Sequence, residues 1–325
     1  MAALTLARQL WLTTPMMRGD DILRLQNRLQ TSGQAAVQAD GIYGRSTRQA
    51  VIDYQRANGL EADGIVGAAT WTRLFAGVEE RAAPAPAAAP AIGIPDSSLS
   101  DVLAGDELKR QGQLHGYYQD GCKWRLGRQG IVVDEKVAAP SDGQMNMVQR
   151  CRGDFRQAIA TATSKFPVPA ELIIACMCTE SGGKPTARRL EPGCDTANPE
   201  RTPSRVSYGL MQTLLSTARE VLKEPNLRLE DTLLPEVSIR SGAAYMWRQS
   251  RQTRFDVPLV AAAYNAGGVY YNNGPDNRWR LRQYPLGTAA HVDRFVGFFN
   301  AALADAQKTR YDRAIPNFAA LLAAG

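Results

Sequence analysis

An alanine- and proline-rich run from Arg81 to Pro95 limits how this chain can fold. Its small side chains cannot bury a hydrophobic core, and its closely spaced prolines favour an extended, semi-rigid spacer. A chain of 325 residues is also long enough for two domains. We therefore predict a small domain over residues 1–76, a linker over 77–98 and a larger domain over 99–325.

The small domain contains an internal repeat. Asp40-Gly41-Ile42-Tyr43-Gly44 is followed by Thr47, and Asp63-Gly64-Ile65-Val66-Gly67 is followed by Thr70. In each copy the Asp-Gly pair supplies a turn, and the threonine stands near the start of the next helix. Apolar residues recur at helical spacing before and between the copies. The pattern predicts a small bundle of about three helices with two matching loops.

In the larger domain, an apolar run from Ile173 to Cys178 leads to Glu180. At the helical angle of about 100° per residue, Ile173, Cys176 and Met177 share the face of Glu180. Apolar surroundings and the negative end of a helix both disfavour a charged carboxylate, so we expect a raised pKa for Glu180. Such an acid suits glycoside cleavage, although a glutamate at a helix end can also be purely structural.

Two turn-like motifs follow this helix. They are Ser207-Tyr208-Gly209-Leu210-Met211-Gln212-Thr213 and Ala262-Ala263-Tyr264-Asn265-Ala266-Gly267-Gly268. Together with Glu180-Ser181, and in this order, they resemble the catalytic domain of soluble lytic transglycosylases and goose-type lysozymes, which cleave the glycan strand of peptidoglycan. The resemblance covers residues 153–303. It implies a lysozyme-like, mainly α-helical domain with minor β structure.

The resemblance also implies roles for single residues. Glu180 is expected to be the catalytic acid and base. Substrate contacts are expected from Ser181, Gln212, Tyr264 and Asn265. Gln212 and Asn265 are amides that donate and accept hydrogen bonds, which suits hydroxyl and N-acetyl groups. Tyr264 offers an aromatic face with a polar tip.

The chain departs from the family pattern in two places. A long insert, Lys184 to Val206, separates Glu180 from the second motif. His291 stands where the family usually places a tyrosine. We include His291 among the substrate-binding candidates, where it would donate to substrate or tune Glu180, and a buried structural role is the alternative.

The number of carboxylates decides the reaction. A lysozyme-type hydrolase needs a second carboxylate. By resemblance, a lytic transglycosylase uses one glutamate, which protonates the glycosidic oxygen and then takes the proton of the muramic acid 6-hydroxyl, leaving a 1,6-anhydro end. No motif fixes a second acid, although the insert offers Glu191, Asp195 and Glu200. We favour the transglycosylase, with a hydrolytic muramidase as the alternative.

The repeat domain resembles the peptidoglycan-binding domain of many wall hydrolases, over about residues 17–76. The expected wall-binding loops contain Asp40, Gly41, Tyr43, Asp63 and Gly64. Joining a binding domain to a catalytic domain raises the effective concentration of the catalytic domain at an insoluble polymer. Bacterial peptidoglycan is therefore the expected partner, and we expect the chain to act as a monomer.

Composition narrows the other possibilities. The formal net charge of +6 and the pI of about 9.1 suit an anionic wall polymer. No cluster of lysine and arginine is interleaved with aromatic residues, so we expect no nucleic-acid partner. The chain has 2 histidines, which makes a zinc site hard to build. We expect no metal and no cofactor.

The 5 cysteines show no repeating pair spacing. Cys176 and Cys178 fall in the apolar run, where buried thiols are expected. One of them could instead pair with Cys194 if the chain is exported.

Residues 99–150 carry no motif that we recognise. Trp124 and Ile131-Val132-Val133, with glycines and prolines around them, favour one or two strands joined by turns. We assign the segment to the amino-terminal edge of the catalytic domain.

The first residues lack a basic region and a small-residue cleavage site, and no apolar run approaches the ~20 residues that span a membrane. We therefore predict a phage-type endolysin, made in the host cytoplasm without a signal peptide and acting on the cell wall in the periplasm after release, with no stable membrane insertion. A prophage remnant, a virion-associated lysin and an injected antibacterial effector are alternatives. A non-catalytic wall-binding or virion protein and a chitin-active relative are the competing functions.

Overall fold

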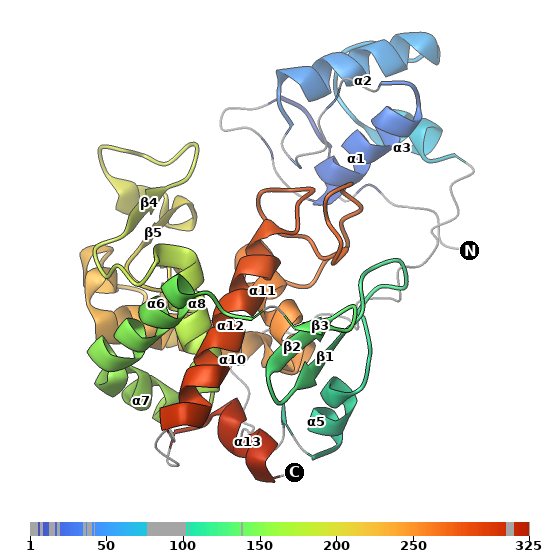
Figure 1. Ribbon diagram of the computed structural model, residues 1–325. Helices are drawn as coiled ribbons and strands as arrows, with labels where there is room; N and C mark the ends of the chain where they lie inside the picture. The colour runs from blue at the N-terminus through green and yellow to red at the C-terminus, as the bar shows by residue number, and fades with distance from the viewer. Residues whose placement is uncertain are drawn as a thin grey trace. The chain divides into compact units, whose positions relative to one another are not determined.

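The computed structural model describes residues 6, 9–12, 17, 20–34, 37, 41, 43–76, 102–103, 105–137, 139–309 and 315–324. The predicted linker over 77–98 lies outside the described residues, as do Asp40 and Ile42 of the repeat. The chain separates into two compact units, Met1–Pro90 and Ala91–Gly325. Figure 1 labels their helices and strands.

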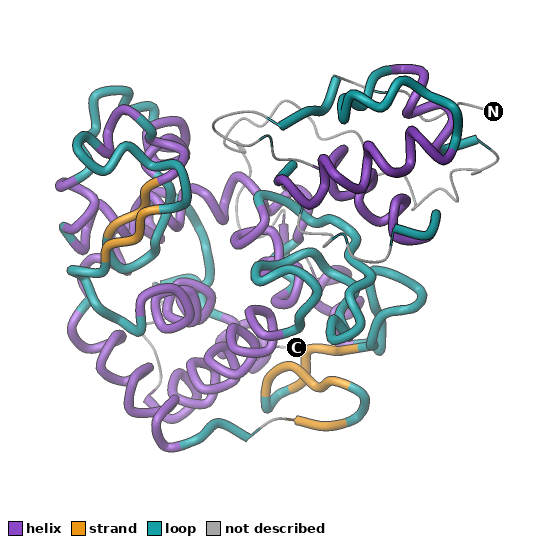
Figure 2. Tube along the Cα trace, turned by 90° about the horizontal axis from the view of Figure 1, so that it is seen from above, coloured by secondary structure: helices purple, strands orange, loops and turns teal. Residues whose placement is uncertain are grey.

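The described part of the smaller unit contains the helices α1 (Asp20–Thr31), α2 (Arg45–Ala57) and α3 (Ala68–Leu74). Figure 2 colours the helices of the chain purple and its strands orange. Apolar side chains three and four residues apart on α1 meet in the core, where Ile22 and Leu29 are fully buried. The predicted three-helix bundle is confirmed.

One buried glutamine holds each copy of the repeat. Gln26 accepts a hydrogen bond from the Gly41 N–H at 2.7 Å and donates to the Thr47 hydroxyl at 2.9 Å. The second copy has the same arrangement, at 2.9 and 3.1 Å, in Gln55, Gly64 and Thr70. Buried polar groups need partners, so each glutamine fixes both its loop and the start of the following helix.

The larger unit is mainly α-helical, as predicted. Its helices are α5 (Gly105–Gly112), α6 (Asp142–Asp154), α7 (Arg156–Lys165), α8 (Ala170–Ser181), α9 (Leu215–Leu222), α10 (Pro235–Thr253), α11 (Val257–Ala266), α12 (Ala290–Thr309) and α13 (Phe318–Ala324). Short 3₁₀ turns are η1 (Pro199–Arg201), η2 (Pro203–Arg205) and η3 (Glu230–Leu233). Helix α12 packs along both α8 and α6 (Figure 1).

Helix α8 lies in the core of this unit. Every residue from Ala170 to Thr179 is buried, which explains why its sequence is apolar on all sides. The helix ends at Gly182, which has a left-handed backbone with φ of 63°. Glycine adopts this conformation without strain, so the helix stops just after Glu180.

Minor β structure is also confirmed. Strands β1 (Trp124–Gly127), β2 (Gly130–Val133) and β3 (Lys136–Val137) form an antiparallel sheet. In the insert, β4 (Arg188–Leu190) pairs antiparallel with β5 (Val206–Tyr208).

Two contacts attach the β1–β3 segment to the helices of the larger unit. The Trp124 indole donates to Asp256 at 2.8 Å, just before α11. The Ile131 N–H donates to Asn300 of α12 at 2.7 Å. These bonds place residues 124–137 within the fold that carries Glu180.

Candidate active site

Glu180 occupies the last turn of α8, with 13% of its side chain exposed. Burial raises the pKa of its carboxyl to about 7, while the positive charges of Arg294 and Arg189 act in the opposite direction. No protein hydrogen bond to its carboxyl group occurs among the described residues. The group is therefore a substantially protonated acid at neutral pH that can donate to a bound ligand.

Glu171, on the same helix, provides an internal comparison. Burial raises its pKa to about 7 as well. Its carboxylate, however, accepts hydrogen bonds from the Phe318 and Ala319 N–H groups at 2.9 and 3.0 Å, at the start of α13. Both oxygens are thus engaged in a structural contact, and the side chain is only 1% exposed. A raised pKa alone therefore does not identify a catalytic acid. A raised pKa together with carboxyl oxygens that have no protein partner is a more specific indication.

His291 lies in the first turn of α12 and faces Glu180. Its Nε2 atom is 3.5 Å from Oε1 of Glu180, and the side chain is 2% exposed. Burial lowers the pKa of His291 to about 3, so its ring is neutral at neutral pH. Its other ring nitrogen donates to the Ala261 carbonyl, which leaves Nε2 as an unprotonated acceptor beside the acid. The contact is therefore a neutral acid beside a neutral imidazole, and not an ion pair.

Tyr264, of the third motif, joins that motif to the second. Its hydroxyl is 2.8 Å from the Thr213 hydroxyl and donates to the Met211 carbonyl at 2.9 Å. The side chain is 8% exposed, and burial raises the pKa of its hydroxyl, with smaller contributions in the same direction from the charges of Cys176 and Glu180. Tyr264 thus lies close to Glu180, but its polar atom is occupied in holding the Gly-Leu-Met-Gln turn.

Gln212 is likewise engaged within its own turn. Its amide donates to the Gly209 carbonyl at 2.8 Å and to the Ala187 carbonyl at 3.2 Å. Its oxygen accepts from the Ser207 hydroxyl at 3.2 Å. The half-buried side chain therefore shapes the loop, and a direct contact with sugar stays a prediction.

Asn265 and Ser181 differ in which hydrogen-bonding atoms remain available for a ligand. The oxygen of Asn265 accepts from the Tyr284 N–H, while its NH₂ group has no partner among the described residues. The Ser181 hydroxyl donates to the Met177 carbonyl of its own helix at 3.0 Å and can still accept a bond. Asn265 thus keeps a free amide donor, and its contact with a sugar stays a prediction.

The three acids of the insert are all engaged. Glu200 accepts from the Leu229 N–H at 2.8 Å and pairs with Arg219 at 3.1 Å. Asp195 accepts from two backbone N–H groups of its own turn. Glu191 pairs with Arg189 at 2.7 Å, and its side chain is as exposed as that of Glu200, at 34% each. None of them is among the charges that shift the pKa of Glu180.

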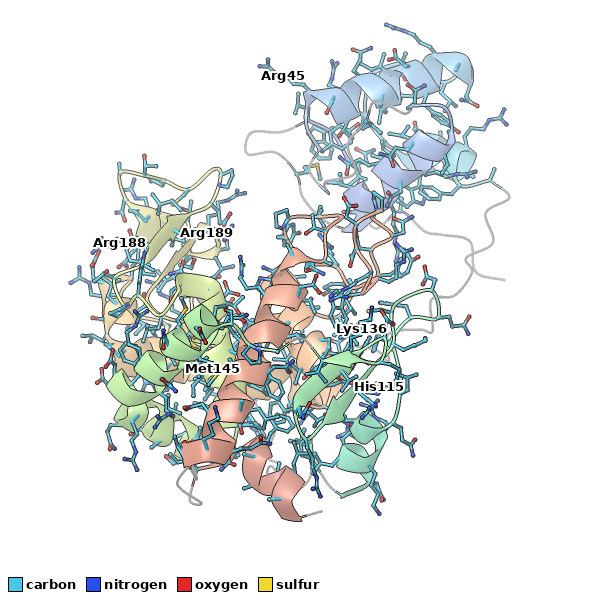
Figure 3. The ribbon with its side chains drawn as sticks, viewed as in Figure 1. Arg45, His115, Lys136, Met145, Arg188 and Arg189 are labelled. Carbon is cyan, nitrogen blue, oxygen red and sulfur yellow. The ribbon has the colours of Figure 1, made fainter. Side chains whose placement is uncertain are left out.

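The sequence offered no sign of the two arginines beside Glu180. Arg189 belongs to strand β4, next to Arg188 (Figure 3), and Arg294 follows His291 by three residues on α12. Arg188 turns to another partner, since it forms a two-pronged bond with Glu230 at 2.8 and 3.1 Å. The charged insert was visible in the sequence, but which of its arginines approaches the acid depends on how the hairpin folds.

The predicted wall-binding residues differ in exposure. Tyr43 is fully buried, and its hydroxyl donates to the Gly64 carbonyl at 2.9 Å, so it joins the two loops from inside. Gly41 is buried as well. Asp63 is exposed and accepts from the Ile65 N–H at 2.8 Å. Asp40 lies outside the described residues.

Within the described ranges, no group of three histidine, cysteine or acidic side chains is arranged to hold a metal ion. In the same part of the chain, no helix combines the length and the apolar character needed to cross a membrane.

Comparisons with known families match two separate segments. Residues 18–74 match the putative peptidoglycan binding domain, and residues 157–287 match the transglycosylase SLT domain. The two segments contain, respectively, the Asp-Gly repeat and all three motifs around Glu180.

Curated relatives match over short stretches. An N-acetylmuramoyl-L-alanine amidase, CwlM, of Mycobacterium tuberculosis is 46% identical over 57 residues, which is 18% of this chain and 14% of that protein. Spore cortex-lytic enzymes are 49% identical over 49 residues in Halalkalibacterium halodurans (15% of each chain) and over 53 in Bacillus subtilis (16% of this chain, 17% of that protein). This chain thus spans about a sixth or less of the length of these relatives.

Two solved structures are similar to this chain at lower sequence identity than these relatives. An inactive mutant of the lytic transglycosylase Slt from Pseudomonas aeruginosa is 20% identical, with a TM-score of 0.35 over 50% of this chain and 25% of that one. The Burkholderia AP3 phage endolysin is 18% identical, with a TM-score of 0.20 over 93% of this chain and 100% of that one.

Proposed function

We propose that this chain, which joins a peptidoglycan-binding domain at residues 18–74 to a transglycosylase SLT domain at residues 157–287, degrades bacterial peptidoglycan. The bond cleaved is the β-1,4 linkage between N-acetylmuramic acid and N-acetylglucosamine. The observation that carries the proposal is Glu180, an acid with unoccupied oxygens and a pKa of about 7 at the end of a buried helix.

In the first step, protonated Glu180 donates to the glycosidic oxygen as the bond to the muramic C1 breaks. A pKa near the working pH suits this transfer, because the acid is then both present and ready to release its proton. The resulting carboxylate is stabilised by Arg294 and Arg189, whose charges favour its ionised form. His291 stays neutral and does not compete for the role of acid.

In the second step, the Glu180 carboxylate takes the proton of the muramic acid 6-hydroxyl, whose oxygen attacks C1. The product carries a 1,6-anhydro end, and Glu180 is protonated again. This transglycosylase outcome is favoured because Glu200 and Asp195 are occupied in structural contacts and Glu191 is paired with Arg189. A hydrolytic muramidase is the second candidate, with Glu191 as the second carboxylate, because among the described residues its carboxylate contacts Arg189 and accepts no backbone N–H bond.

We further propose that the protein acts as a phage-type endolysin in bacterial lysis, on the cell wall and as a monomer. Support comes from the combination of a wall-binding domain with a catalytic domain, because tethering keeps the catalytic domain close to an insoluble polymer. The wall would be reached from the periplasm after release from the host cytoplasm.

Glu180→Gln tests the enzyme against a non-catalytic wall-binding protein. The amide keeps the shape of the side chain but cannot donate a carboxyl proton. Clearing of cell-wall suspensions should fall at least 100-fold, the usual contribution of a general acid, while pelleting with walls persists. Glu135→Gln, at an exposed glutamate of the same unit, is the matched control and should clear walls like the parent. Glu191→Gln separates the two candidates, because it should clear walls like the parent if Glu180 acts alone and should lose clearing if Glu191 is a second catalytic carboxylate. If the parent pellets with walls but never clears them, the enzyme proposal fails.

A further inference from the structure

Two cysteine side chains touch in the core of the larger unit. Cys151 of α6 and Cys178 of α8 place their sulfur atoms 3.8 Å apart. Both are buried, at 0% and 3% exposure, and both are free thiols. A disulfide has its sulfurs about 2.05 Å apart, so bond formation needs the two atoms to approach by less than about 2 Å.

We propose that Cys151 and Cys178 are a disulfide-forming pair that ties α6 to the last turns of α8, two residues before Glu180. The partner chemistry is a disulfide oxidant, met when the protein leaves a reducing compartment. This setting rests on the proposed function at the cell wall, because thiols stay reduced in the cytosol and oxidise outside it. The ability of the two thiols to form a disulfide does not depend on that function.

The surrounding contacts favour this crosslink. Arg150, beside Cys151, donates to the Gly182 carbonyl at the end of α8, at 3.2 Å. Gly183 packs so closely on the Cys151 sulfur that a Cβ at this position would lie 2.5 Å from it. The end of α6 thus already rests against the end of α8, and a bond between the helices requires little backbone movement.

The other cysteines are positioned for different contacts. Cys176 lies about 200° around the helix from Cys178, on the side of Tyr264 and Glu180. Burial raises the pKa of the Cys176 thiol, the charge of Glu180 adds to this, and a hydrogen bond with Tyr264 acts in the opposite direction. Cys194, which the sequence offered as a partner for Cys176 or Cys178, instead accepts from the Thr202 hydroxyl at 3.4 Å. The sequence predicts buried thiols at Cys176 and Cys178, with a Cys194 pair as the alternative; the sulfur that lies nearest to Cys178 is instead that of Cys151.

The crosslink can form by thiol–disulfide exchange with a small disulfide such as oxidised glutathione. The Cys151 thiolate attacks one sulfur of the oxidant, forms a mixed disulfide and releases one glutathione. The Cys178 thiolate then attacks the Cys151 sulfur and releases the second, so two protons leave the protein and the oxidant gains two electrons. The hydrogen bond from Cys178 lowers the pKa of Cys151, with Arg150 assisting, which favours the attacking thiolate. Because both sulfurs are buried, exchange takes place during folding or local opening.

The expected consequence is thermal stability at the active-site end of α8. The bond closes a loop of about 28 residues and so restricts the unfolded chain. For a unit of this size, the stabilisation corresponds to a rise in Tm on the order of 5–10 °C. The turnover rate at moderate temperature should be the same in both states, because neither sulfur contacts Glu180.

Thiol counting on the full chain tests the pair directly. The protein is refolded with oxidised and reduced glutathione, denatured, and labelled with an alkylating reagent for mass spectrometry. The parent should fall from 5 free thiols to three. Cys151→Ala and Cys178→Ala should each keep all four of their thiols, whereas the control Cys176→Ala should fall from four to two.

The melting temperature supplies a second readout. Oxidised parent should melt higher than reduced parent, and reductant should remove the difference. Cys178→Ala should show no such shift, while Cys176→Ala should retain it. Five unreacted thiols in the parent, or a bond that maps to Cys122 or Cys194, would overturn the proposal. A protein that forms the bond but cleaves no peptidoglycan would refute the proposed function and leave the pair standing.

Discussion

Replacing the proposed catalytic acid should make the protein more stable in a pH-dependent way. Glu180 has a pKa of about 7 in the folded chain, against the ordinary value of 4.5. The folded state therefore binds a proton more tightly than the unfolded state between these two values, so the free energy of unfolding falls as the pH rises through this window. Below pH 4.5 the effect is absent, and above pH 7 it is complete.

The difference of about 2.5 pKa units corresponds to roughly 3 kcal/mol, at 1.36 kcal/mol per unit. Glu180→Gln removes the titrating group and keeps its shape. The variant should therefore match the parent to within about 1 kcal/mol near pH 4.5, and exceed it by roughly 3 kcal/mol near pH 8.5. Glu171 also titrates near pH 7, but it is present in both proteins and cancels in the comparison.

Urea denaturation of both proteins at several pH values measures this difference. The transition of the larger unit should move to higher urea in Glu180→Gln as the pH rises from 4.5 to 8.5. A gap between the two proteins that does not change with pH would refute the reasoning, because Glu180 would then have its ordinary pKa in the folded state. A variant that is less stable at pH 8.5 would refute it too.

Three further predictions follow from the same contacts. Wall-clearing activity should fall as the pH rises through about 7, because Glu180 loses the proton that it must donate, and a pH–rate profile that stays flat to pH 9 would contradict this. Tyr264→Phe should lower the free energy of unfolding by about 2 kcal/mol in urea, since the hydrogen bonds of its hydroxyl to Thr213 and Met211 are lost. Gln55→Ala should weaken pelleting with walls more than it weakens cleavage of soluble glycan fragments, because it leaves the Gly64 N–H without its partner and loosens only the smaller unit.

Local signals in the sequence were enough to predict much of the fold. The Asp-Gly repeat and the helical spacing around it predict a three-helix bundle, and the structure has α1, α2 and α3 there. The apolar run before Glu180 predicts a buried helix, because a helix without a polar face has to lie in a core. In both cases the information lies within about 15 residues of the element itself.

Contacts between segments that are distant in the sequence could not be predicted from local patterns. No local pattern marks Gln26 as buried, yet it is fully buried and fixes a loop 15 residues away. Glu171 lies nine residues before Glu180, about 180° around a helix, but its partners at Phe318 and Ala319 lie almost 150 residues later. The approach of Arg294 to Glu180 likewise depends on how α12 packs against α8, which no local pattern encodes. His291 was a candidate through the family resemblance and not through a local pattern.

The central claim is that a single glutamate, Glu180, cleaves the glycan strand with the muramic 6-hydroxyl as the nucleophile. Mass spectrometry of the muropeptides released from purified Gram-negative peptidoglycan tests it most directly, with Glu180→Gln beside the parent. The account predicts products that end in 1,6-anhydromuramic acid from the parent and none from the variant. Products one water heavier, with reducing muramic ends, would contradict it and indicate a hydrolase with a second carboxylate.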